Sequence, residues 1–133
     1  MKFIFDSDTI IFYLKDYPSV AQKVASFKVG ELSISSMAYA EVMLGAYRSR
    51  NGSGRKVATT IELLELFSLV DFDRYSAEVF AEIKSELMKK GQIVEDSDLI
   101  IASTAVANGM TLVTNNEKHF KRIKGLKLEN WYK

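Results

Sequence analysis

The chain has no cysteine, one proline and one histidine among its 133 residues. Without cysteine, a disulfide framework and a thiolate metal site are both excluded, and a reducing cytoplasm fits. A single histidine, His119, excludes a zinc site built from imidazoles. No apolar run approaches the ~20 residues that a membrane-spanning helix needs, and no signal-peptide pattern follows the first two residues. We therefore expect a cytoplasmic protein with no membrane partner.

An excess of charge is also missing, because the formal net charge is only +1. Bulk charge therefore does not point to a nucleic-acid partner. Hydrophobic residues make up 47% of the chain, which is enough apolar material for a core without disulfides or structural metals. The length favours one domain, which we expect to span residues 1–133.

What the chain does have is a set of carboxylates placed beside apolar runs. Asp6 and Asp8 follow the run Phe3-Ile4-Phe5, Glu41 lies among small and apolar residues, and Asp98 begins an apolar stretch. An isolated ionised carboxylate is costly to bury, so acids that recur in such places suggest a shared partner. Carboxylates and waters suit the hard cations Mg²⁺ and Mn²⁺.

Short apolar runs alternate with helical patterns along most of the chain. We expect strands near residues 2–5, 32–35, 69–72, 110–114 and 126–128, with helices between them. Asp8 or Ser7 is predicted to cap the first helix, and Gly91 and Gly109 to end the last two. This alternation predicts an α/β fold: a single-domain α/β/α sandwich around a mostly parallel sheet of four to five strands.

Each acid also has a simpler explanation. Helix capping explains one member of the pair Asp6 and Asp8 but not both. Glu41 is either a functional side chain or a solvent-facing glutamate on its helix. Asp98 suits a first helical turn for electrostatic reasons alone, yet together with Glu95 and Asp96 it exceeds what a cap requires.

Basic residues gather in two stretches that contain few acids. We expect these to guide a phosphate backbone, with simple solvation as the alternative and partner docking as a further alternative for the first stretch. The candidate residues are Arg48, Arg50, Arg55, Lys56, Lys121 and Arg122.

The ordered motifs resemble those of the PIN-domain ribonucleases, and in particular the VapC-type toxins of toxin–antitoxin pairs. The motifs are Phe5-Asp6-Ser7-Asp8-Thr9, then Ile34-Ser35-Ser36 through Glu41, then Asp98-Leu99-Ile100-Ile101-Ala102, and finally Leu112-Val113-Thr114-Asn115-Asn116 with Gly125 to Trp131. No motif is specific alone, but all four in this order over this length are.

The resemblance implies a PIN-like fold and a metal-dependent endoribonuclease acting on RNA, with Asp6, Glu41 and Asp98 holding Mg²⁺ or Mn²⁺ and Asp8 or Asn116 assisting. It also implies a homodimer and a small antitoxin partner. Many family members carry a fourth acid where this chain has Asn116, so Glu95 or Asp96 becomes a candidate for that charge.

Two other functions compete. The segment Asp6-Ser7-Asp8-Thr9 also matches the opening of haloacid-dehalogenase-like phosphatases, with Asp6 as nucleophile and Thr114 as the phosphate-binding hydroxyl. In that family the metal-binding acids follow the Thr strand, whereas here they precede it. The third possibility is a non-catalytic interaction module with structural acids.

Overall fold

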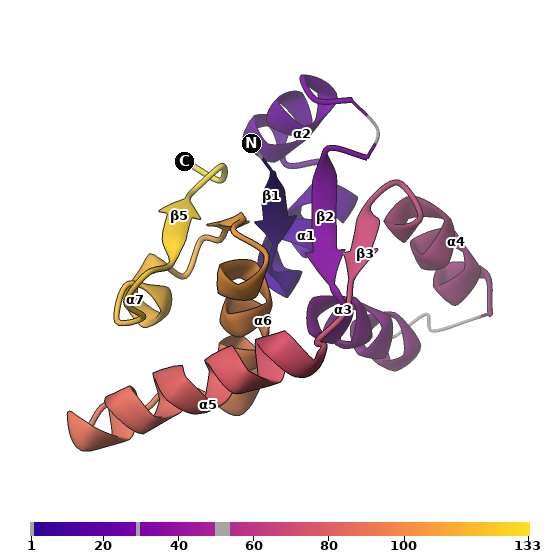
Figure 1. Cartoon of the computed structure of the whole chain (residues 1–133). Coiled ribbons are helices and arrows are strands. Elements are labelled where there is room, and N and C mark those ends of the chain that lie inside the picture. Colours follow the sequence, from indigo (N-terminus) through magenta and orange to yellow (C-terminus); the bar gives the residue numbers. More distant parts are fainter. Residues whose placement is uncertain (1, 29, 50–53) are drawn as a thin grey trace.

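Five parallel strands form one sheet in the computed structural model, which describes residues 2–28, 30–49 and 54–133 (Figure 1). The strands are β1 (Phe3–Phe5), β2 (Leu32–Ser35), β3 (Ser68–Val70), β4 (Thr111–Val113) and β5 (Lys127–Glu129). The helices are α1 (Ser7–Leu14), α2 (Pro18–Ala25), α3 (Ser36–Arg48), α4 (Gly54–Leu64), α5 (Arg74–Lys89), α6 (Asp96–Ala107) and α7 (Glu117–Phe120). The predicted α/β class and parallel sheet are confirmed.

The sheet has the order β3-β2-β1-β4-β5, so the chain builds outward from β1 in one direction and then in the other. Between β3 and β4 the chain returns across the sheet through α5 and α6. Neighbouring strands β1 and β4 therefore lead their following segments in opposite directions. In open parallel sheets, the crevice at this reversal, outside the carboxyl ends of the strands, is where ligands bind.

Both faces of the sheet are covered by helices. Every residue of β1, β2 and β4 is buried, although successive side chains on a strand point to opposite faces. Helix α6 passes through the centre, with Leu99, Ala102 and Ala105 fully buried, as its nearly uniform apolar sequence predicts. A sheet covered on both sides explains the continuous apolar strands.

Glycine ends α5 and α6 where the sequence predicts. Gly109 has φ +63° just after α6, and the backbone N–H of Met110 donates to the Ala105 carbonyl at 2.9 Å. Gly91 has φ +67° after α5, and the N–H of Gln92 donates to the Leu87 carbonyl at 2.9 Å. Both ends have the pattern in which a left-handed glycine lets the last carbonyls be satisfied.

Aromatic packing ties the C-terminal segment to the first strand. The Trp131 ring lies 5.2 Å from Phe3 and 5.0 Å from Phe5, and it stacks on Phe27 at 5.4 Å between centroids. Figure 1 accordingly places the two ends of the chain near each other. No helix within the described ranges is both long and apolar enough to cross a membrane.

One local expectation was wrong, and one short helix was missed. Helix α1 starts at Ser7 and its cap is Asp6, not Asp8 or Ser7. Helix α7 was not expected at all, because four residues are too few to show a helical repeat of apolar positions.

Candidate functional site

The carboxyl ends of β1 and β4 lie side by side at the reversal of strand order. Phe5 pairs in register with Val113, so the next residues along the two strands, Asp6 and Thr114, face each other across the sheet edge. The Asp6 backbone N–H donates to the Val113 carbonyl at 3.2 Å, and the Thr9 hydroxyl donates to the same carbonyl at 3.1 Å. The start of α1 is thereby attached to the end of β4.

Asp6 is the most buried of the candidate acids, with 4% of its surface exposed. Its Oδ1 accepts the Thr9 backbone N–H at 2.9 Å, and its Oδ2 accepts a short hydrogen bond from the Thr114 hydroxyl. Burial raises the pKa of Asp6 from 3.8 to about 6, against the opposing effect of these hydrogen bonds. The carboxylate is thus held in one orientation in surroundings that disfavour its charge.

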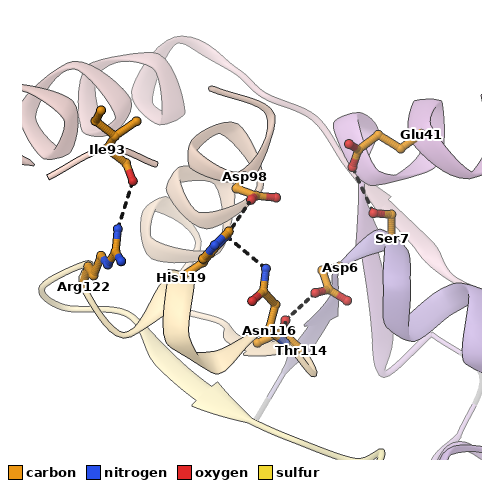
Figure 2. A network of polar contacts seen from close by, with 9 residues as sticks. All are labelled: Asp6, Ser7, Glu41, Ile93, Asp98, Thr114, Asn116, His119 and Arg122. Carbon is orange, nitrogen blue, oxygen red and sulfur yellow. Dashed lines mark hydrogen bonds and ion pairs between the residues drawn. The ribbon is translucent and has the colours of Figure 1, made fainter. Parts of the chain in front are cut away.

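The Thr114 hydroxyl also accepts the Asn116 backbone N–H at 2.9 Å. One hydroxyl therefore connects the buried carboxylate to the turn that begins α7. The Asn116 side-chain amide in turn lies 3.1 Å from His119 Nδ1 (Figure 2). A line of polar contacts thus extends from the end of β1 to the first turn of α7.

Glu41 lies in the second turn of α3 and reaches the start of α1. The Ser7 hydroxyl donates to its Oε1 at 3.0 Å, linking residues 34 positions apart in sequence. Burial raises the pKa of the Glu41 carboxyl, and the Ser7 hydrogen bond opposes that rise. The negative charges of Asp98, Asp8 and Glu95 raise it further. Glu41 is therefore half-buried among other acids rather than a solvent-facing glutamate.

Asp98 lies in the first turn of α6, with 24% of its side chain exposed. Its Oδ2 lies 3.7 Å from His119 Nδ1. Burial raises the pKa of Asp98, and His119 opposes this through a hydrogen bond and its charge. The negative charges of Glu95 and Asp8 add to the rise.

The auxiliary acids separate into two kinds. The charge of Asp8 raises the pKa values of Asp6, Glu41 and Asp98, so Asp8 lies close to all three although it is exposed. Asp96 instead forms an ion pair with Lys84 of α5, with Oδ1 at 2.8 Å from Nζ. Of the two candidates for a fourth negative charge, the structure therefore favours Glu95.

The donor chemistry of this acidic cluster, defined as Asp6, Glu41 and Asp98, fits a hard divalent cation. Burial and neighbouring acids raise all three pKa values, so a positive ion placed among them would relieve a cost that the fold otherwise bears. The side chains do not yet surround one point. No group of three or more Asp, Glu, His or Cys residues in the described ranges is close enough to hold an ion as it stands.

The predicted basic residues fall in two places, not one. Arg48 ends α3 and Arg55 and Lys56 begin α4, beside edge strand β3, whereas Lys121 and Arg122 follow α7, beside edge strand β5 (Figure 1). Arg122 donates to the Ile93 carbonyl at 3.0 Å, holding the loop before α6. Arg50 lies outside the described residues.

Three further side chains contact the acids without being predicted to do so. Ser7 holds Glu41, Thr114 holds Asp6 and His119 contacts Asp98. Thr114 was assigned a place in the fourth motif and a role in the phosphatase alternative, and His119 was given no role at the site. Register between parallel strands would have placed Thr114 beside Asp6, but no local sequence signal indicates the other two contacts.

The PIN domain family model matches residues 4–126. The chain is 34% identical to "Ribonuclease VapC2" of Rickettsia felis, with 100% of each chain covered. It is 31% identical to "tRNA(fMet)-specific endonuclease VapC" of Salmonella typhimurium, with 98% of each covered.

One solved structure is similar to this chain in both fold and sequence. It is the crystal structure of VapBC2 from Rickettsia felis bound to a DNA fragment from the promoter of the pair. The superposition has a TM-score of 0.89 at 32% identity and covers 98% of this chain and 99% of that one. The likeness therefore spans the strands and helices that carry the acidic cluster.

Proposed function

The chain belongs to the PIN-domain family and, within it, to the VapC-type ribonucleases, and we propose that it hydrolyses RNA phosphodiester bonds with Mg²⁺ or Mn²⁺ held by Asp6, Glu41 and Asp98. The observation that carries this proposal is that three carboxylates with raised pKa values lie around the strand-order reversal, although their side chains do not yet surround one point. A cation bound there would supply an activated water and stabilise the leaving oxygen.

The surrounding residues supply orientation. Asp6 is held from both sides by Thr9 and Thr114, and Glu41 is held by the Ser7 hydroxyl. Carboxylates that are fixed before a ligand arrives lose less conformational freedom when they bind it. Hydrogen-bond partners that orient metal ligands in this way raise the affinity for the metal. Because the chain has only one histidine, no pair of imidazoles can act as the base.

The family assignment also weighs against the two other functions. The phosphatase alternative requires metal-binding acids after the strand that carries Thr114. In this chain Glu41 and Asp98 both precede that strand, and the charge of Asp8, two residues from Asp6, raises the pKa values of both. The interaction-module alternative needed structural acids, whereas burial and mutual repulsion make these acids a cost to the fold.

We propose a toxin–antitoxin role in the cytoplasm, because the Rickettsia felis relative was solved together with its VapB partner. A cavity of about 400 Å³ between α1, α3 and α4, lined in part by Leu14, Val42 and Leu63, could accept apolar side chains of an antitoxin segment. Exposed Leu44 and Tyr47 on α3 and Tyr75 on α5 also support a protein contact, and we include a homodimer in the proposal.

Cleavage of RNA tests this proposal directly. The Salmonella typhimurium relative is named as specific for tRNA(fMet), so initiator tRNA is the first substrate to try, beside an unstructured RNA and a phosphatase substrate. We expect cleavage with Mn²⁺ or Mg²⁺, none with chelator, and loss of cleavage in Asp98→Asn. Glu86→Gln, an exposed acid on α5, is the matched control and should cleave normally.

The basic residues give a second test of the RNA assignment. Neutralising Lys121 or Arg55 should weaken RNA binding similarly for all sequences and lower its salt dependence, because phosphate contacts carry no base information. Unchanged affinity at low salt in both variants would mean that these charges are only solvated. Measuring antitoxin binding by the same Arg55 variant separates an RNA contact from a partner contact.

A further inference from the structure

We propose that His119 is a positioning residue that holds Asp98 and, through Asn116 and Thr114, connects it to Asp6, in place of the fourth acid that this chain lacks at position 116. The inference rests on the proposed function, since it concerns the same acids. It goes beyond that function by assigning a role to His119, three residues after the position of the missing acid.

The contacts form a continuous line between two acids that come from distant elements (Figure 2). Thr114 donates to Asp6 Oδ2 and accepts the Asn116 backbone N–H at 2.9 Å. His119 Nδ1 lies 3.1 Å from the Asn116 side-chain amide and 3.7 Å from Asp98 Oδ2. A protonated Nδ1 donates toward both groups when the Asn116 amide turns its oxygen to the ring. Residues 114–119 thereby span the space between the end of β1 and the start of α6.

His119 is not placed as a core residue would be. Its side chain is 50% exposed and it belongs to α7, a helix of only four residues. A half-exposed ring contributes little by packing, so the directed contacts of Nδ1 are its main contribution to the surroundings. Removing the ring should therefore change the geometry of Asp98 much more than the stability of the fold.

The His119 ring and a fourth carboxylate would affect the charge of the acidic cluster differently. A fourth carboxylate would add negative charge to a cluster whose members already repel one another. The His119 ring instead places a ring nitrogen, not a carboxylate oxygen, 3.7 Å from Asp98 Oδ2. Asn116, which is uncharged, can then hold the ring without adding to the repulsion.

The test compares His119→Ala with the unsubstituted protein in two measurements. We expect the affinity for Mn²⁺, measured by calorimetry without RNA, to fall about tenfold or more, because partners that orient metal ligands typically contribute 10- to 100-fold. We expect kcat for RNA cleavage to fall by a similar factor with KM unchanged. Lys118→Ala, an exposed neighbour on the same helix, is the control and should change neither value.

Two further variants separate positioning from contact with the substrate. Asn at position 119 can place its amide near where Nδ1 lies, whereas Gln reaches the position of Nε2. Rescue of Mn²⁺ affinity by His119→Asn but not by His119→Gln supports positioning through Nδ1. Rescue by His119→Gln alone, or a rise in KM with kcat unchanged, would overturn it.

The outcomes distinguish this inference from the proposed function. Tight Mn²⁺ binding that His119→Ala weakens, in a protein that cleaves no RNA, would contradict the proposed function and support the inference. Cleavage and Mn²⁺ affinity that are both unaffected by His119→Ala would overturn the inference and leave the function standing. In a double-mutant cycle, His119→Ala and Asn116→Ala should be non-additive, because they act in one line of contacts.

Discussion

The same tripeptide, Asp-Ser-Asp, opens two helices of this protein with opposite results. At residues 6–8 the first aspartate is buried against the sheet and the second is exposed. At residues 96–98 the first aspartate is exposed and forms an ion pair with Lys84, and the second belongs to the acidic cluster. The same tripeptide thus turns its first aspartate inward at the start of α1 and its last aspartate inward at the start of α6.

The difference lies in where the helix starts. Asp6 is the N-cap of α1, whereas Asp96 is already the first residue of α6 and Glu95 takes the cap position. Residues two apart in a helix point in nearly opposite directions, so only one aspartate of each tripeptide can face the sheet. A shift of one residue in the helix start therefore makes the other aspartate of the tripeptide face inward. Substituting the corresponding residues of the two tripeptides tests this contrast.

The largest effect is expected on RNA cleavage when the inward acid of either tripeptide is changed. Asp6→Asn and Asp98→Asn should each reduce kcat/KM by ~100-fold or more, a loss of about 2.7 kcal/mol of transition-state stabilisation. Asp8→Asn should cost only a few-fold and Asp96→Asn nothing measurable. Cleavage rates with Mn²⁺ check the order, and equal effects within either pair would contradict the comparison. Asparagine can still cap α1, so circular dichroism should show an intact fold.

The pH dependence of stability should distinguish Asp6 from ordinary surface carboxylates. The folded-state pKa of Asp6 is raised from 3.8 to about 6, so its contribution to stability is fully present below pH 3.8 and is lost as the pH rises through 6. The difference amounts to about 3 kcal/mol. Urea unfolding in chelator at pH 4 and pH 7 measures it.

Asp6→Asn is the control for that experiment, because it removes this titration and keeps the cap. The variant should lose less stability between pH 4 and pH 7 than the unsubstituted protein does. Asp73 and Glu117 have lowered pKa values and so act in the opposite direction, which is why the difference between the two proteins is the informative quantity. Parallel pH profiles would show that Asp6 is not buried as a charged group.

The middle serines of the two tripeptides should differ by a smaller factor. Ser7 donates to Glu41 at 3.0 Å, whereas among the described residues no carboxylate partner is found for Ser97. Ser7→Ala should lower kcat by about tenfold, as loss of a group that orients a metal ligand does, and Ser97→Ala should leave it unchanged. Glu41→Gln combined with Ser7→Ala should be no worse than Glu41→Gln alone.

The smallest effect is expected at the outward acid of α6. Lys84 and Asp96 are 40% and 62% exposed, so breaking their ion pair should lower the free energy of unfolding by less than about 1 kcal/mol. Chemical denaturation of Asp96→Asn and Lys84→Met measures this, and the loss should shrink at high salt. A loss of several kcal/mol would mean that Asp96 has a further, buried partner.

Much of the fold could be predicted from residue patterns because the decisive interactions are local. The limits of β2 (Leu32–Ser35), the Asp73 cap of α5 and the glycines after α5 and α6 all follow from apolar periodicity, caps and breakers. The burial of α6 follows from its lack of a polar face. The cap of α1 was assigned to the wrong residue because a strand end and a helix start adjoin there, and either aspartate suits the cap.

The members of the candidate site were chosen from the sequence, but the contacts among them were not. Asp6, Glu41 and Asp98 stand out because acids beside apolar runs are unusual. The contacts of Ser7 and His119 could not be predicted, since both look like ordinary polar residues until the chain folds, whereas strand register places Thr114 beside Asp6. The same limit explains why Arg48 and Lys121, both basic and exposed, were grouped together but lie at opposite edges of the sheet.

By itself, the sequence determined the alternation of strands and helices, the parallel sheet that this alternation requires, and the acids that do not belong to an ordinary core. Only the tertiary structure decided which aspartate of each Asp-Ser-Asp faces inward, which side chains hold the acids, and that Asp96 forms an ion pair with Lys84. The reason is physical. Patterns along the chain report burial and local hydrogen bonds, whereas the direction of one carboxylate depends on the phase of its helix against elements that are far away in sequence.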